Sequence, residues 1–180
     1  MKKAIFLDRD GVINKTVLVN GIPKPPDTIT EVKILAGVTQ ALKLLEDAKF
    51  EIVVVTNQPD VARGFVTQEF VEETNKYLEQ KLGIKHFYIC YHDDHHKCEC
   101  RKPNPGLLLR AARDLDLDLS TSFMVGDRWR DVAAGQAAGC QCYFIDYGYT
   151  EKSPISPYTQ VYSLFQAVQN ILESCNDHVN

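Results

Sequence analysis

The sequence predicts a doubly wound α/β domain in which a mainly parallel sheet is flanked by helices. Strand-like runs alternate with helical patterns along the chain, which is the order of elements that produces such a fold. Most of the strand-like runs are apolar throughout, as expected of strands that are buried on both faces. Several of these runs end in a polar residue, and in this fold ligands bind beyond the carboxyl ends of the strands. We therefore expect the functional site at those ends.

The individual elements follow from the spacing of apolar residues. Five apolar runs predict strands at residues 4–8, 51–56, 87–90, 122–126 and 142–146. Apolar residues at helical spacing predict helices at residues 38–48, 68–82, 105–115, 130–138 and about 161–172. The proline-rich stretch 21–26 is expected to pass over the site as a loop, and residues 148–157 are expected to be irregular. We expect one domain over residues 1–180, with a small metal-binding loop at 90–100 and an irregular tail and final helix at 148–180.

Composition limits the partners of this domain. The 180 residues are 44% hydrophobic, which is enough for a substantial core, and their number fits one domain. The 20 basic and 24 acidic residues nearly cancel, so no overall positive field favours nucleic acid, and a small substrate is expected. No segment resembles a signal peptide or reaches membrane-spanning length. We therefore expect a cytoplasmic protein, a monomer without membrane contact.

The first predicted strand ends in Asp8 and Asp10, followed by Gly11, and this acidic pair is the most informative feature of the chain. Side chains two residues apart on an extended chain point the same way, so both carboxylates can meet one ligand. One carboxylate can attack phosphorus while the other handles the proton of the leaving group, with a divalent cation offsetting the crowded charge. A solvated acidic pair at a turn has the same sequence, so the motif alone does not decide.

Two further segments carry groups suited to a phosphate. Thr56 ends the second predicted strand, and its hydroxyl can donate to a phosphate oxygen, although threonine after a valine run is also ordinary strand chemistry. Lys102 precedes a proline-rich turn and supplies a cation, although a basic residue on a surface loop is usually only solvated.

Asp127 ends the fourth predicted strand and is a candidate oxygen ligand for Mg²⁺. Asp131 follows one helical turn later and can either support the same metal site or interact favourably with the helix dipole. The sequence leaves open whether Asp131 would contact the metal directly.

A cluster of cysteine and histidine predicts a second metal site. Three of the six cysteines occur in the arrangement Cys-x-His, five residues, Cys-x-Cys. Three thiolates and one imidazole form a closed tetrahedral set suited to structural Zn²⁺: Cys90, His92, Cys98 and Cys100. A disulfide is the rival interpretation, but Cys-x-Cys is an awkward span for one and the protein is expected to be cytoplasmic. His95 and His96 could compete with His92. Zinc would fasten a loop that lacks its own core and hold Lys102 over the phosphate.

Taken together, these segments resemble the four motifs of the haloacid dehalogenase superfamily, in the same chain order and at the expected strand ends. The resemblance implies that Asp8 is the nucleophile that becomes an aspartyl phosphate, and that Asp10 is the general acid and then the base. It makes Thr56 the residue of the second motif and Lys102 the lysine of the third. It also implies a catalytic Mg²⁺ bound by Asp8, Asp127 and the backbone carbonyl of Asp10.

The metal-binding loop resembles that of the small, cap-poor phosphatases acting on heptose bisphosphate and on histidinol phosphate. The spacing of the motifs leaves too little chain for a cap domain, so loops would contact and select the substrate. Segments 8–14, 56–64 and 100–106 favour the heptose branch, which implies hydrolysis of a heptose 1,7-bisphosphate to the 1-phosphate. On this resemblance, the candidate substrate contacts are Asn57, Gln58, Arg63, Arg101 and Arg128.

Some residues depart from the heptose pattern. Pro59 and Asp60 stand where serine and glycine are expected, and the loop at 15–29 is longer and richer in proline. Residues 128–130 include an unexpected tryptophan and a second arginine. Histidinol phosphate or another small monoester is therefore a second candidate substrate. The sequence also leaves open a phosphotransferase, which the lack of a cap argues against, and a zinc-stabilised module without activity.

Overall fold

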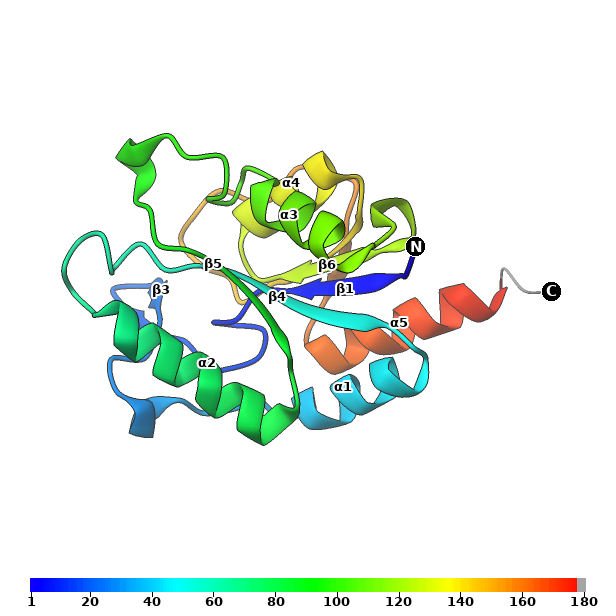
Figure 1. Ribbon diagram of the computed structural model, residues 1–180, viewed down its shortest axis with the longest axis horizontal. Helices are drawn as coiled ribbons and strands as arrows, with labels where there is room; N and C mark the ends of the chain where they lie inside the picture. The colour runs from blue at the N-terminus through cyan, green and yellow to red at the C-terminus, as the bar shows by residue number, and fades with distance from the viewer. Residues whose placement is uncertain (178–180) are drawn as a thin grey trace.

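The computed structural model describes residues 1–177 of the chain and contains a six-stranded sheet (Figure 1). Every pair of neighbouring strands in this sheet is parallel. In their order across the sheet, the strands are β5 (His86–Cys90), β4 (Glu51–Asn57), β1 (Ala4–Leu7), β6 (Phe123–Gly126), β7 (Gln141–Ile145) and β8 (Thr159–Val161). β1 lies in the middle of the sheet, so the acidic pair that follows it leaves the sheet at its centre.

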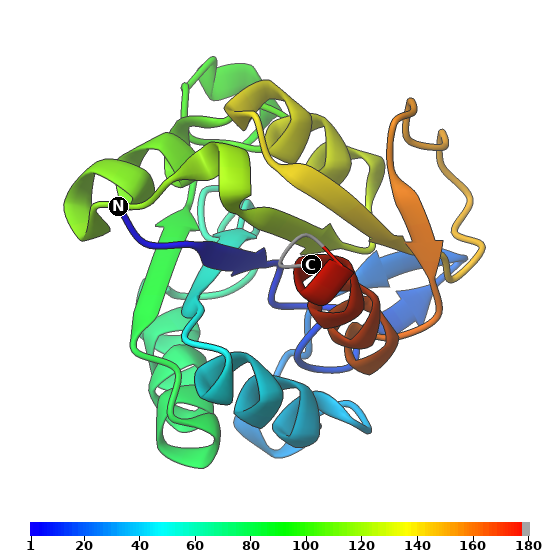
Figure 2. The ribbon, with the colours of Figure 1, turned by 90° about the vertical axis from the view of Figure 1, so that its right-hand side faces the viewer.

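Helices cover both faces of the sheet (Figures 1 and 2). The core on one face includes residues of α1 (Val38–Asp47), α2 (Gln68–Leu82) and α5 (Leu164–Asp177). The core on the other face includes residues of α3 (Gly106–Leu115) and α4 (Trp129–Ala138). Successive residues of β1 alternate between the two cores: Ile5 and Leu7 pack on the first, Ala4 and Phe6 on the second. Such burial on both faces explains why the strands are apolar throughout.

The predicted elements are confirmed with small shifts at their ends. α2 has the predicted bounds because both ends carry capping signals. The Thr67 side chain accepts a hydrogen bond from the Phe70 amide at 3.2 Å, and Gly83 adopts the left-handed conformation that ends the helix. The fold has no large cap domain: between β1 and α1, the described chain forms only a two-stranded hairpin and the short 3₁₀ helix η1 (Ile29–Glu31). Two further 3₁₀ helices are η2 (Asp94–His96) and η3 (Leu119–Thr121).

The structure adds strands to the proline-rich segment and to the tail, while residues 148–157 are irregular as predicted. The proline-rich loop contains an antiparallel hairpin of β2 (Val17–Val19) and β3 (Ile22–Lys24). Its turn is Asn20-Gly21, in which both residues have positive φ, and this dipeptide is the usual signal for a two-residue hairpin turn. The tail adds β8 to the sheet edge, so the final helix begins at residue 164 rather than near 161 (Figure 2). Residues 178–180 of the predicted tail lie outside the described part of the chain.

Among the described residues, no helix is long and apolar enough to cross a membrane.

Candidate active site

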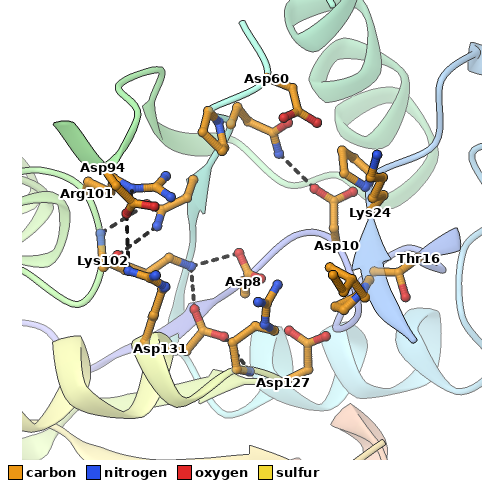
Figure 3. Close-up of a pocket in the computed structure, with 18 of the residues that line it drawn as sticks. Asp8, Asp10, Thr16, Lys24, Asp60, Asp94, Arg101, Lys102, Asp127 and Asp131 are labelled. Atoms are coloured by element: carbon orange, nitrogen blue, oxygen red, sulfur yellow. Dashed lines mark hydrogen bonds and ion pairs between the residues drawn. The ribbon is translucent and has the colours of Figure 1, made fainter. Parts of the chain in front are cut away.

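Asp8 and Asp127, predicted from two strand ends, line one cavity at the carboxyl edge of the sheet together with Asp10 and Lys102 (Figure 3). The cavity has a volume of about 270 Å³. Acidic and basic side chains dominate its wall: Asp8, Asp10, Asp60, Asp94, Asp127 and Asp131 face Lys24, Arg63, Arg101, Lys102, Arg128 and Arg130. The same wall includes Asn57 and Gln58. A cavity of this composition suits a small, charged ligand rather than an apolar one.

Lys102 holds the centre of the site together. Its side chain is almost fully buried, and Nζ lies 2.8 Å from Oδ1 of Asp8 and 2.7 Å from Oδ1 of Asp131. It also donates to the carbonyl oxygen of Val55 at 2.7 Å. Burial alone would lower the pKa of Lys102, but the charges of Asp131 and Asp8 outweigh it and hold that pKa above its usual value. The lysine is therefore a fixed positive charge beside Asp8.

The side chain of Asn57 fixes the backbone at Lys102. Asn57 Nδ2 donates to the Lys102 carbonyl oxygen at 2.9 Å, and Asn57 Oδ1 accepts from the Lys102 amide at 3.1 Å. Both polar atoms of the predicted substrate contact Asn57 are thus engaged by the neighbouring loop. Asn57 links the end of β4 to the buried lysine beside Asp8.

The carboxylates of the site crowd one another. Oxygens of Asp8, Asp127 and Asp131 lie within 4.8 Å of each other, and all three side chains are buried. Burial raises the pKa of Asp8 to about 6 against the opposing charge of Lys102, and the Asp131 charge adds to the rise. Burial also raises the pKa of Asp127 well above its usual value, with a further contribution from Asp8. One lysine does not balance three buried carboxylates, so a second cation would stabilise this cluster.

A glycine allows the crowded carboxylates to approach the first-motif loop. Gly11 has φ +94°, and a Cβ built there would lie 2.0 Å from Oδ2 of Asp127. Any side chain at residue 11 would therefore displace Asp127 as well as strain the backbone.

The carboxylate set fits Mg²⁺. Oδ1 of Asp127 is buried and has no hydrogen-bond partner among the described residues, although such an atom is normally paired. A divalent cation with a preference for oxygen ligands would satisfy this atom and offset the charge of Asp8. Asp131 is occupied in other ways, because one of its oxygens pairs with Lys102 and the other accepts from the Arg128 amide at 2.9 Å. These contacts favour an indirect role of Asp131 at the metal.

Asp10 lies beside Asp8 in a separate hydrogen-bond network. Its oxygens accept from Nη2 of Arg9 at 3.0 Å, Nδ2 of Asn14 at 2.8 Å and Nε2 of Gln58 at 2.8 Å. These three donors fix the orientation of the carboxylate while it still lines the cavity. Arg9, Asn14 and Gln58 are all buried, and of the three only Gln58 also lines the cavity.

The predicted phosphate contact Thr56 lies one layer deeper than expected. The residue is buried and does not line the cavity. Its hydroxyl accepts a hydrogen bond from Nε2 of Gln58 at 3.0 Å, the same group that donates to Asp10. In this structure, Thr56 and the predicted substrate contact Gln58 therefore orient Asp10.

The three predicted arginine contacts line the cavity, and each is held by carboxylates. Arg63 bridges Asp60 and Asp93, which joins the loop after β4 to the cysteine loop. Arg128 forms a bidentate pair with Glu151 in the tail.

Arg101, the third of these, donates from Nε to Oδ1 of Asp94 at 2.9 Å. Arg130 also approaches this oxygen, at 3.4 Å. The positions of these arginines are set by acidic partners at the rim of the cavity.

The predicted zinc ligands converge as expected for one metal ion. The sulfur atoms of Cys90, Cys98 and Cys100 are 3.2–3.7 Å apart, and Nδ1 of His92 lies 3.3 Å from the Cys100 sulfur and 3.5 Å from that of Cys90. In a tetrahedral site with Zn–S bonds of about 2.3 Å, sulfurs lie about 3.8 Å apart. The cluster is compatible with zinc and contains no disulfide. His96 does not join it, because its Nδ1 accepts from the Asp93 amide.

The tail supplies site residues that the sequence did not predict. Tyr149 donates to Oδ2 of Asp127 at 2.9 Å, and Tyr147 donates to the Gly11 carbonyl at 2.9 Å. Glu151 pairs with Arg128 from the same segment. No motif marks these residues, because their roles arise only when the tail folds back along the edge of the sheet. Asn14 falls within a segment that the resemblance covers, but its contact with Asp10 requires the turn at Gly11.

Known proteins resemble this chain in sequence and in fold. The chain is 36% identical to the D-glycero-beta-D-manno-heptose-1,7-bisphosphate 7-phosphatase of Pasteurella multocida over 149 residues, which cover 77% of this chain and 78% of the relative. It is 33% identical to the D-glycero-alpha-D-manno-heptose-1,7-bisphosphate 7-phosphatase of Photorhabdus laumondii over 165 residues, covering 84% and 87%. The family described as HAD-hydrolase-like matches residues 99–167.

Among solved structures, the fold matches the D,D-heptose 1,7-bisphosphate phosphatase from B. bronchiseptica, complexed with magnesium and phosphate. The TM-score is 0.83, and the match covers 96% of this chain and 99% of that chain at 27% sequence identity.

Proposed function

The chain belongs to the haloacid dehalogenase-like phosphatases related to heptose-1,7-bisphosphate 7-phosphatase and is a phosphoric monoester hydrolase, and from this premise we propose its substrate and mechanism. The proposed reaction removes the 7-phosphate of D-glycero-D-manno-heptose 1,7-bisphosphate and leaves the 1-phosphate. The relatives carry names for both anomers of this sugar, so they support the substrate class and leave the anomer to experiment.

The observation that carries the proposal is the placement of Asp8 between Lys102 and Asp10 at the centre of the cavity. Asp8 lies 2.8 Å from the lysine ammonium, and both aspartates line the cavity. A phosphate drawn to Lys102 would thus present its phosphorus to a carboxylate whose direction is already fixed. Asp10, which three donors hold in place, would transfer the protons of the leaving sugar oxygen and of the attacking water.

In the first step, an oxygen of Asp8 forms a bond to phosphorus while the bond from phosphorus to the sugar oxygen breaks. Asp10 donates a proton to that sugar oxygen as it leaves. In the second step, Asp10 takes a proton from water as the water oxygen attacks phosphorus, and the bond to Asp8 breaks to release inorganic phosphate. Lys102 binds the phosphate oxygens in both steps.

We propose that Asp8, Asp127 and the backbone carbonyl of Asp10 hold the catalytic Mg²⁺. The buried, unpaired Oδ1 of Asp127 supports this assignment. Mg²⁺ would supply electrostatic stabilisation of the charge that builds up on the phosphate oxygens.

The cysteine cluster is proposed to bind structural Zn²⁺, since its donor set and spacing suit that ion. Cysteines that bind a metal rather than form disulfides are typical of reducing compartments, so we propose a cytoplasmic enzyme. We further propose that it acts as a monomer with a single domain, which size-exclusion chromatography with light scattering tests.

A phosphate-release assay tests the proposed function. The panel contains both anomers of heptose 1,7-bisphosphate, histidinol phosphate and glucose 6-phosphate, each with and without Mg²⁺. We expect Mg²⁺-dependent release with a clear preference for heptose bisphosphate, and loss of release in Asp8→Asn. Preference for histidinol phosphate would contradict the substrate but keep the reaction class. Failure on every monoester would contradict both.

A further inference from the structure

Lys24 differs from the other cations that line the cavity. Arg63, Arg101, Lys102, Arg128 and Arg130 each pair with at least one carboxylate. The side chain of Lys24 makes no ion pair or hydrogen bond to another described residue, although it lines the same cavity. Any second anion in the cavity would have to compete with carboxylates for the paired arginines. At Lys24 it would meet a charge that no protein group offsets.

The backbone around Lys24 is held in place before any ligand arrives. Lys24 ends β3, where it pairs with Val17 across the hairpin. Pro23 precedes it and the prolines at 25 and 26 follow, so φ is fixed at three of the four positions 23–26. The residue before a proline is also restricted to extended conformations, which includes Lys24 itself. Ordering this segment on binding therefore costs little backbone entropy.

The hairpin segment also lies close to the tail at two points, one of which is a hydrogen bond. The hydroxyls of Thr16 and Tyr149 lie 3.3 Å apart. At the hairpin turn, a Cβ built on Gly21 would lie 3.2 Å from Oγ1 of Thr150, which shows how closely the turn approaches the tail. Since Tyr149 also binds Asp127, the wall that carries Lys24 is connected to the proposed metal site.

Lys24 lies on the opposite side of the cavity from the cation of the reacting phosphate. Figure 3 shows Lys24 beside Asp10, across the cavity from Lys102 and Arg101. A phosphate held at Lys102 would therefore leave the rest of the substrate to extend toward other parts of the wall, including the hairpin.

We propose that Lys24 binds the second phosphate of a bisphosphorylated sugar, the phosphate that is not transferred. This proposal rests on the proposed function and adds a specificity-determining residue to it. Such a residue acts on the affinity for substrates that carry the second phosphate. It leaves the chemical step unchanged, because it touches neither the attacking nor the leaving atom.

The test compares Lys24→Ala with wild type on heptose 1,7-bisphosphate and on heptose 7-phosphate, which lacks the second phosphate. We expect KM for the bisphosphate to rise about tenfold, as for loss of one charged hydrogen bond, with kcat unchanged. KM for heptose 7-phosphate should stay unchanged. Lys24→Arg should restore most of the affinity for the bisphosphate, because it returns the positive charge.

Lys33→Ala is the matched control. Lys33 is an exposed lysine of the same segment between β1 and α1, and it does not line the cavity. Its removal takes the same charge from the protein, so a general field effect would appear in both variants. Added salt should reduce the preference of wild type for the bisphosphate more than it reduces that of Lys24→Ala.

The two ways in which the test can fail are distinguishable. If wild type hydrolyses the bisphosphate but Lys24→Ala changes neither KM, or changes both KM values equally, the role of Lys24 is wrong and the proposed function stands. If wild type does not act on heptose bisphosphate at all, the proposed function is wrong and the role of Lys24 falls with it.

Discussion

The hydroxyl of Tyr149 donates a 2.9 Å hydrogen bond to Oδ2 of Asp127, one of the proposed Mg²⁺ ligands. The other oxygen, Oδ1, is buried without a partner among the described residues. The phenol therefore fixes which oxygen faces the metal position. A residue of the tail, outside the four motifs, thus orients the carboxylate at the end of β6.

Tyr149→Phe should weaken Mg²⁺ binding while leaving the fold intact. A hydrogen bond to a charged group contributes about 1.5–3 kcal/mol, so we expect the Kd for Mg²⁺ to rise about tenfold or more. Isothermal titration with Mg²⁺ measures this without substrate. Tyr162→Phe, at an exposed tyrosine, is the control. An unchanged Kd in Tyr149→Phe would show that the phenol does not orient the ligand.

Mg²⁺ binding should strengthen as the pH rises. Burial raises the pKa of Asp8 to about 6 and also raises that of Asp127, so in the metal-free protein both carboxyl groups keep their protons to higher pH than ordinary aspartates do. Mg²⁺ must displace these protons, and its affinity should rise between about pH 5 and pH 7.5. Titrations in two buffers of different ionisation enthalpy would detect the released protons. Asp8→Asn should release fewer, and a pH-independent affinity would refute the prediction.

Lys102→Met should destabilise the protein strongly in the absence of Mg²⁺. The substitution leaves Asp8 and Asp131 buried without their cation, and breaking a buried ion pair costs about 3–5 kcal/mol. Urea unfolding measures the change in the free energy of unfolding. Mg²⁺ should recover part of the loss, because it restores positive charge beside Asp8. Lys85→Met, at an exposed lysine, should change the stability little, and equal effects of the two variants would contradict the prediction.

Asp10→Asn should slow turnover and keep substrate binding. The amide keeps the shape of the side chain but cannot donate and accept the proton in turn, so kcat should fall about 10²- to 10⁴-fold with little change in KM. Steady-state kinetics give both constants. Asp60→Asn removes another carboxylate from the cavity wall and should reduce kcat much less. Near-normal turnover in Asp10→Asn would remove Asp10 from the acid and base role.

Loss of zinc should affect substrate affinity more than the chemical step. Cys98→Ser should lower the zinc content, measured by mass spectrometry, and lower Tm by about 10 °C. The loop that carries Arg101 would lose its anchor, so KM should rise. Lys102 keeps its contacts with Asn57 and Asp8, so kcat should fall less than KM rises. Cys175→Ser is the control, and zinc content unchanged in Cys98→Ser would refute the assignment.

The central sheet and the carboxylate site could be predicted from the sequence for the same physical reason. β1, β4 and β6 are buried on both faces, so their apolar runs are unambiguous. Because these strands are parallel neighbours, the residues at their carboxyl ends must meet. Asp8 and Asp127 could therefore be paired from the sequence alone.

The missed elements lack a hydrophobic signal of their own. β8 has three residues, and only Val161 is buried, so its strand character comes from pairing with β7. All three residues of β2 are exposed, so only the Asn-Gly turn marks the hairpin. Tyr149 and Glu151 carry no pattern at all, because their partners are more than twenty residues away in sequence.

The two bonds from Asn57 to the backbone of Lys102 have a consequence for how this enzyme can change during evolution. At the other end of the cysteine loop, the backbone N–H of Gln58 donates to the Cys90 carbonyl oxygen at 2.8 Å. Residues 91–101 are thus anchored at both ends to the end of β4, and the contacts of Arg63 with Asp93 and of Arg130 with Asp94 hold the loop between these anchors. A change of loop length that spares these contacts and the proposed zinc ligands would leave Lys102 beside Asp8. Because Asn57 holds the backbone of Lys102 independently, residues of the loop that line the cavity, such as Asp94, can change without moving the lysine.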